Sequence, residues 1–255
     1  MNGERQFGRR AFTSVLGAMG LFTRRAAAFG EAGAFRARLL AAGKSHPDDA
    51  RVAGTARWGS ELVRRTSAPA HEEAETVAAD RPALFREPFA VWAGAEDVGA
   101  LSLSEVGGLE RFLRLGGTLV VDDSEPTSGA FGRSVRRELL RALPESPPVR
   151  LETSHVLFKT FYLLDRPYGR VLGPPYVEAI VRGRNAVVLF LAHDLLGALA
   201  RRGEGWAYGV EPGGLEQREH AIRFAVNIAM YVLCSDYKDD VVHAPFLLQR
   251  RGRAR

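Results

Sequence analysis

The 255-residue chain is 46% hydrophobic and 25% charged, which excludes a disordered or fibrous protein and suits one large globular domain. Its formal net charge is +5, but segments 1–28 and 250–255 each contribute +4, so the rest of the chain carries −3. Because a slightly acidic body binds phosphate backbones poorly, we predict no nucleic-acid partner.

Residues 1–28 have the pattern of an export signal. A basic start precedes the apolar run 11–22, which is shorter than the about 20 residues that span a bilayer. Small residues at 26–28 suit a cleavage site, and Arg9-Arg10-Ala11-Phe12 resembles the twin-arginine signature. We therefore predict a periplasmic or otherwise exported protein without a transmembrane segment. The alternative is an uncleaved amphipathic helix at the N-terminus.

Strand and helix signals alternate in the next part of the chain. Residues 35–40 alternate between apolar and basic, which predicts a first strand, and a loop of turn formers follows. We expect a helix that is capped by Thr55 and ends near Arg65. A short strand is predicted at 73–79, and the compact apolar run 89–93 predicts a fully buried strand.

A βαβ unit is indicated after that buried strand. Ser102 or Ser104 can cap a helix that ends at Leu115, and Gly116-Gly117 is typical of a helix stop. The apolar run 118–121 then predicts another buried strand. The order strand, helix, strand implies parallel strands joined by a right-handed crossover.

The last part of the chain predicts a hairpin and a long helix. A helix is expected over residues 131–143. Apolar runs at 177–181 and 186–191 are separated by Arg-Gly-Arg-Asn, which predicts a hairpin. Apolar residues recur at helical spacing over 215–233, so we expect this last helix to pack against a sheet.

Three segments follow from these patterns. They are an export signal of the twin-arginine type at 1–28, a single α/β domain at 29–234, and a basic, partly disordered tail at 235–255.

Five sequence blocks of the domain occur in the same order as in a known family. They are 112–123 (FLRLGGTLVVDD), 131–145, 154–164, 191–200 and 225–233. Together they resemble domain-of-unknown-function family 4159, over about residues 35–233. The resemblance implies a bacterial, often exported protein whose fold is similar to class I glutamine amidotransferase-like and trehalose-utilisation-type domains. That fold is a flavodoxin-like three-layer α/β sandwich with a mostly parallel central sheet and helices on both faces, here with a C-terminal hairpin region.

Polar residues follow three of the predicted strands, at the sheet edge where open α/β sheets bind ligands. The residues are Glu96, Asp97, Asp122, Asp123, His193 and Asp194. If the strands are neighbours, this cluster can hold a hard cation or raise the pKa of one carboxyl group. The alternative is that the carboxylates cap helices and accept hydrogen bonds from loop amides.

Four further residues complete this candidate ligand-binding rim. They are Glu125, Arg133, His155 and Tyr162. Arg133 lies on an arginine-rich helix face that can bind an anion, pair with the rim acids or simply be solvated. His155 resembles part of a trehalose-utilisation-type motif, although a hydrogen-bonded structural histidine is an equal alternative.

The sequence lacks the motifs of common catalytic sites. No serine-hydrolase elbow, zinc-protease motif or nucleotide-binding loop occurs, and the single cysteine, Cys234, lies at the end of the last predicted helix. We expect Cys234 to be a core or helix-end residue, and we predict no cofactor and no metal.

Two hypotheses about function remain. The first is a non-catalytic binding or interaction module of the bacterial cell envelope, whose partner is an envelope protein or a small anionic or sugar-like ligand. The alternative is a hydrolase or a carbohydrate-modifying enzyme that uses the acidic rim, with Asp122, Asp123 and His193 carrying the chemistry.

Overall fold

The apolar runs of the sequence form the strands of a central sheet, and its amphipathic segments form the helices that cover it. The computed structural model describes residues 33–252, and of residues 235–252 the backbone alone. These residues contain a seven-stranded sheet of order β2-β1-β3-β4-β7-β6-β5. The export signal predicted at 1–28 lies outside the described residues.

Five neighbouring strands of this sheet are parallel. β1 (Arg38–Ala41) lies between β2 (Glu75–Ala78) and β3 (Phe89–Gly94). β4 (Thr118–Asp123) pairs with β3 on one side and with β7 (Asn185–Leu191) on the other. This is the strand order of flavodoxin-like folds, so the predicted fold class is confirmed.

The sheet ends in antiparallel strands. β6 (Val177–Arg182) pairs with β7 as the predicted hairpin, and β5 (Val149–Leu151) extends the edge. A separate hairpin of β8 (Arg201–Arg202) and β9 (Gly205–Trp206) lies outside the main sheet. The mostly parallel sheet with a hairpin region therefore has the predicted composition.

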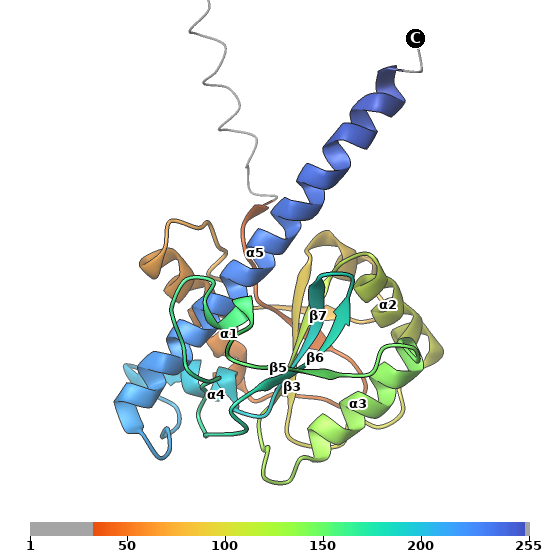
Figure 1. Ribbon diagram of the computed structural model, residues 1–255. Helices are drawn as coiled ribbons and strands as arrows, with labels where there is room; N and C mark the ends of the chain where they lie inside the picture. The colour runs from red at the N-terminus through yellow and green to blue at the C-terminus, as the bar shows by residue number, and fades with distance from the viewer. Residues whose placement is uncertain (1–32, 253–255) are drawn as a thin grey trace, which may run out of the picture. The chain divides into compact units, whose positions relative to one another are not determined.

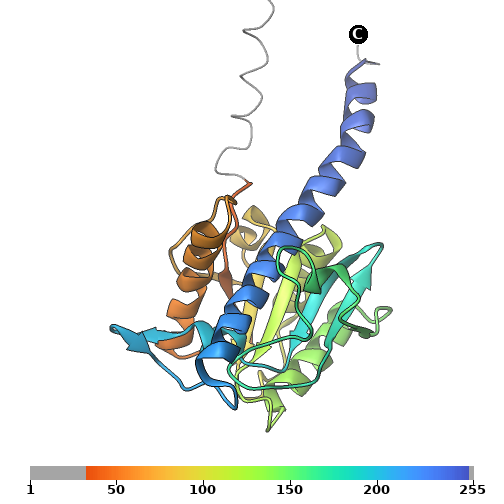
Figure 2. The same cartoon turned by 60° about the vertical axis from the view of Figure 1, so that its left-hand side comes forward.

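Helices cover both faces of the sheet (Figures 1 and 2). α2 (Leu103–Arg114) and α3 (Ala130–Ala142) lie on one face. α1 (Asp49–Arg65), α4 (Leu195–Leu199) and α5 (Gly214–Gly252) lie on the other. Within the described part of the chain, none of the helices combines the length and hydrophobicity that a membrane span requires.

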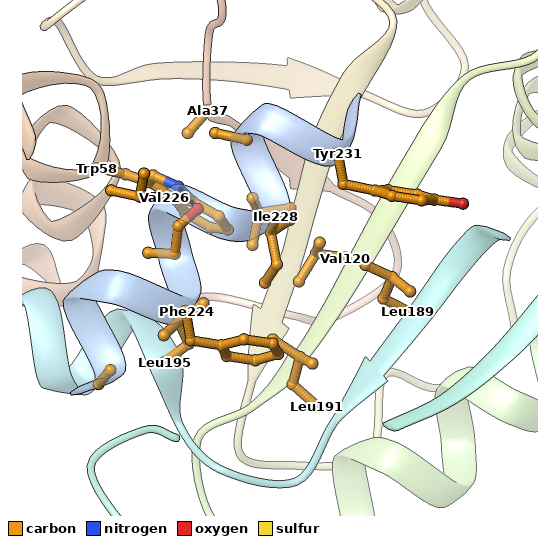
Figure 3. Close-up of a cluster of buried hydrophobic side chains, with 14 of the residues drawn as sticks. Ala37, Trp58, Val120, Leu189, Leu191, Leu195, Phe224, Val226, Ile228 and Tyr231 are labelled. Atoms are coloured by element: carbon orange, nitrogen blue, oxygen red, sulfur yellow. Dashed lines mark hydrogen bonds between the residues drawn. The ribbon is translucent and has the colours of Figure 1, made fainter. Parts of the chain in front are cut away.

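Each central strand contributes to two cores, because successive side chains of a strand point to opposite faces. In β4, Val120 packs in the core under α1, α4 and α5, whereas Val121 packs in the core under α2 and α3. Figure 3 shows Phe224 and Ile228 of α5 directed at the sheet. Burial of both faces explains why the strands read as continuous apolar runs rather than alternating ones.

A fully buried arginine in β1 holds the connection between β2 and β3. Arg38 has 0% exposed surface. Its guanidinium donates to the carbonyl oxygens of Ala83 at 2.8 Å, Leu84 at 3.0 Å and Glu87 at 2.7 Å. These carbonyls belong to or follow the short 3-10 helix η2 (Pro82–Arg86), so one side chain fixes this segment over the sheet.

The predicted start of α1 at Thr55 is wrong. The N-cap is Asp48, whose carboxylate accepts hydrogen bonds from the first amides of the helix, and Thr55 lies inside it. Gly54 lies in the segment predicted as a loop, and packing between helices explains why a glycine stands there. A Cβ atom there would lie 2.9 Å from the carbonyl oxygen of Leu196, so glycine lets α1 approach α4 closely.

The last helix is longer than predicted. α5 continues beyond residue 233 to Gly252. Cys234 is exposed within it, so the expectation of a core or helix-end cysteine is wrong. Among the α5 residues whose side chains the structure describes, Tyr231 and Val232 are the last buried ones.

Two adjacent glycines of α2 allow a matched test of helix packing. A Cβ atom on Gly108 would lie 1.9 Å from the carbonyl oxygen of Ala79, whereas one on Gly107 would meet nothing within 4 Å. We expect Gly108→Ala to destabilise the domain by about 1–3 kcal/mol through overpacking. Gly107→Ala should stabilise it by about 0.5–1 kcal/mol. Urea denaturation measures both, and equal effects would contradict the packing argument.

Candidate functional site

The carboxyl ends of β4 and β7 bring two carboxylates together. Asp122 is in register with Leu191, and Asp194 follows shortly after β7. Asp122 is fully buried, and its two carboxylate oxygens accept hydrogen bonds from the amides of Leu195 at 2.8 Å and Leu196 at 2.7 Å. Burial and the neighbouring Asp194 carboxylate raise the pKa of Asp122 to about 8, against the effect of the two amides.

Asp194 is the centre of a buried charge network. Its backbone is left-handed, with φ of 51°, and its Oδ1 caps α4 by accepting from the amide of Gly197 at 3.0 Å. Arg51 binds the same carboxylate with two nitrogens, at 2.9 Å and 2.6 Å, and the Nε of Arg170 donates to Oδ2. Two guanidinium groups thus compensate one fully buried carboxylate.

Residues nearer the surface complete this network. The second terminal nitrogen of Arg51 pairs with Asp48, the N-cap of α1. Asp48 also accepts from the Tyr208 hydroxyl at 2.6 Å, and the Tyr208 ring lies 4.5 Å from the Arg51 guanidinium carbon. Arg170 donates to the carbonyl oxygen of Ser124 at 3.3 Å, which ties it to the end of β4. Arg51, Arg170 and Tyr208 are not among the residues that the sequence predicts.

Asp123 faces the opposite side of the sheet. Its oxygens accept from the amides of Glu125 at 3.0 Å and Gly132 at 3.1 Å. Burial raises the pKa of Asp123. Asp122 and Asp123 therefore do not share one site, as the alternation of strand side chains requires, and both accept backbone amides.

The exposed acids of the rim do not join the buried pair. Asp97 pairs with Arg137 of α3 at 3.2 Å and accepts from the amide of Gly99 at 2.7 Å. The Arg137 guanidinium lowers the pKa of Asp97. Glu96 is exposed. No group of three or more histidine, cysteine or acidic side chains in the described residues could hold a metal ion.

Glu125 and Arg133 lie on the loop after β4 and the start of α3. Glu125 is exposed, with one oxygen 4.0 Å from a terminal nitrogen of Arg170. Arg133 donates to the carbonyl oxygen of Ser128 at 2.9 Å, which is a local contact of its own helix start. Of the arginines on this helix face, Arg137 is the one that pairs with a rim acid.

His155 and Tyr162 contact α5 rather than the strand ends. The His155 ring lies 5.9 Å from that of Tyr231, whose hydroxyl accepts from the amide of Ala186 near the amino end of β7. This is the end of the strand opposite to the rim. The amide of Tyr162 donates to Asn227 at 2.7 Å. The structure therefore does not bring these two residues to Asp122.

His193 is buried beneath the segment that leads into β6. Its Nε2 lies 2.9 Å from the carbonyl oxygen of Pro174, so Nε2 carries the proton and donates. Nδ1 has no hydrogen-bond partner among the described residues. Burial lowers the pKa of His193 to about 4, which keeps the ring neutral at pH 7.

His193 should make the domain sensitive to acid. Its pKa is about 4 in the folded state and 6.5 otherwise, so the unfolded chain binds the proton first as the pH falls. Between pH 7 and pH 4 we expect a loss of up to roughly 3 kcal/mol of stability. His193→Gln should remove this part of the pH dependence in urea denaturation.

The exposed loop variant His46→Gln is the control and should leave the pH dependence unchanged. The raised pKa of Asp122 acts with the opposite sign, but Asp122 is present in every variant and cancels in the comparison. Parallel curves for the wild type and His193→Gln would contradict the prediction.

A comparison with protein families fits this architecture. The model of a family described as domain of unknown function (DUF4159) matches residues 37–233. The chain belongs to this family. The DUF4159 match begins just before β1 and ends in α5, so it spans the sheet, both helical layers and the Asp122–Asp194 pair. No curated protein matches the chain.

In this DUF4159 domain, the loops after β1 and β3 contact each other at the position where flavodoxin-like folds bind ligands. The amide of Lys44 donates to the carbonyl oxygen of Val98 at 2.8 Å, which joins the loops after the two strands. The Phe131 ring and the Ser45 hydroxyl pack against Gly94, where a Cβ atom would meet them at 2.7 and 2.8 Å. The exposed acids of the rim are Glu96 and Asp97, which follow β3, and Glu125, which follows β4.

Proposed function

We propose that this DUF4159 domain is an exported, non-catalytic binding or interaction module of the bacterial cell envelope. The observation that carries the proposal is the hydrogen bonding of the three carboxylates at the strand ends. Each oxygen of Asp122, Asp123 and Asp194 accepts a hydrogen bond from a backbone amide or an arginine. Acid–base catalysis needs a group that can reach the substrate. These carboxylates instead stabilise the conformation of the rim.

We do not extend the proposal to the hydrolase or carbohydrate-modifying activity that an acidic rim suggests. The carboxyl group with the pKa most suited to proton transfer, Asp122, is fully buried, and amides occupy both of its oxygens. Asp123 accepts a hydrogen bond from the amide of Gly132, whereas His193 donates to the carbonyl oxygen of Pro174.

The binding surface would be the exposed layer over this rigid base. Glu96, Asp97 and Glu125 are exposed at the ends of the neighbouring strands β3 and β4, and the half-buried Arg170 lies beside Glu125. A partner that docks here would meet fixed polar groups and would order few side chains, which favours affinity.

Site-specific crosslinking tests the rim as an interaction surface. A photo-crosslinking amino acid at Glu125, on the rim, is compared with one at Glu110, a partly exposed acid on α2. In the exported full-length chain, we expect a discrete crosslinked product from position 125 and none from position 110. Identical products, or none from either position, would contradict the proposal.

The export part of the proposal rests on residues 1–28. Arg9→Lys with Arg10→Lys should retain the chain in the cytoplasm, because the twin-arginine route requires the arginine pair. Arg24→Lys with Arg25→Lys is the matched control and should still be exported. Fractionation and immunoblotting measure both, and unchanged export of the first variant would rule out this route.

A further inference from the structure

A cluster of three arginines surrounds Trp206, away from the rim carboxylates. Figure 2 shows the β8–β9 hairpin beside α1. Arg201 and Trp206 are cross-strand partners on this hairpin. The guanidinium carbons of Arg218, Arg201 and Arg57 lie 4.3, 5.3 and 5.7 Å from the centre of the Trp206 ring. Arginines from α1, the hairpin and α5 therefore converge on one aromatic side chain.

Arg218 is buried without a carboxylate partner. It is 4% exposed, and its terminal nitrogens donate to the carbonyl oxygens of Ala198 and Tyr208. No ion pair of Arg218 occurs among the described residues. Burial lowers its pKa. A buried charge in proteins is normally paired, so the site carries uncompensated positive charge.

The other two arginines increase this surplus. Arg57 pairs with Glu61, but the same carboxylate also binds Arg64 and Arg65. Arg201 donates to a backbone carbonyl and has no ion pair within the part of the chain that the structure describes. The Nε atoms of all three arginines around Trp206 are buried and lack a hydrogen-bond acceptor there. The unbalanced positive charge of the three arginines points to an anion.

We infer that the arginines around Trp206 form a binding site for a phosphate group, held chiefly by the partly exposed Arg57 and Arg201 between α1 and the β8–β9 hairpin. Guanidinium groups from two separate elements can donate to different oxygens of one tetrahedral anion. A planar carboxylate needs only one such fork. The nearby Arg218 contributes fixed positive charge from below. This site is separate from the crosslinking surface at Glu125 and does not depend on it.

Titration with inorganic phosphate tests the inference. Trp58 and Trp92 are fully buried, whereas Trp206 is half-buried, so Trp206 reports on the site by fluorescence. We expect saturable quenching and a matching heat of binding in calorimetry. Arg201→Gln and Arg57→Gln should each weaken binding by about tenfold or more, as loss of a charge-assisted hydrogen bond implies. Circular dichroism confirms that each variant is folded.

Arg202→Gln is the matched control, because it removes the same charge from the same hairpin at an exposed position that does not contact Trp206. It should bind phosphate as the wild type does. Glucuronate as a carboxylate probe should bind more weakly than phosphate. Vesicles with and without phosphatidylglycerol then show whether a lipid phosphate is also accepted.

Three results would overturn the inference. They are no saturable phosphate binding by the wild type, unchanged binding by Arg201→Gln, and an equal loss in Arg202→Gln, which indicates non-specific charge attraction. Each leaves the crosslinking result at Glu125 untouched, so failure of this site is distinguishable from failure of the proposed function.

Discussion

Arg38→Met is expected to destabilise the domain by about 3–5 kcal/mol, the range for breaking a buried charged hydrogen-bond network. Methionine fills much of the same volume, but it donates no hydrogen bond. The carbonyl oxygens of Ala83, Leu84 and Glu87 would lose this buried donor. Urea denaturation of the variant should show a lower midpoint with an unchanged slope.

Two control variants test whether the loss depends on the guanidinium geometry and on burial of the arginine. Arg38→Lys keeps the charge but has no planar fork to reach several carbonyls, so it should recover only part of the loss. Arg114→Met removes an arginine that is half exposed and pairs with Glu110 on the same helix, and it should have little effect. A small effect of Arg38→Met itself would mean that the segment after β2 is held in another way.

The second large effect is expected for Asp194→Asn, at about 2–4 kcal/mol. Asparagine has the same shape and tolerates the left-handed backbone. Its amide nitrogen, however, would face the donors of Arg51 or Arg170 in a fully buried position. Thermal and urea unfolding measure the loss.

The control is Asp97→Asn, which is also an arginine-paired aspartate but is exposed to solvent. It should change stability little, because water compensates an exposed pair. In a double-mutant cycle, Arg170→Met should cost less in the Asp194→Asn background than in the wild type. Additive effects would show that Arg170 and Asp194 do not act together.

The sheet was predictable because its strands are buried on both faces. Runs such as 89–93 and 118–121 are too short and apolar for surface helices. Gly94 follows the first run, and Gly116-Gly117 separates the intervening helix from the second. The same pattern located Asp122 at a strand end. The hairpin before β7 followed from its turn residues.

The partners of Asp194 were not predictable from local pattern. Arg51 lies 143 positions away in the first turn of α1, and Arg170 lies in a segment without regular structure. Neither has a motif, because a buried ion pair depends on how distant elements pack and not on neighbouring residues. A correct start of α1 at Asp48 would have placed Arg51 in the first helical turn, but it would not have identified the acid that it binds.

Asp122 and Asp123 also affect how cooperatively the domain unfolds. These consecutive residues bind opposite layers, since Asp122 holds the first amides of α4 and Asp123 holds an amide of α3. Both helix starts lose these hydrogen bonds if the end of β4 leaves the sheet. Opening of that strand end would therefore expose amides of both layers in a single event, which makes the two halves of the sandwich one unfolding unit.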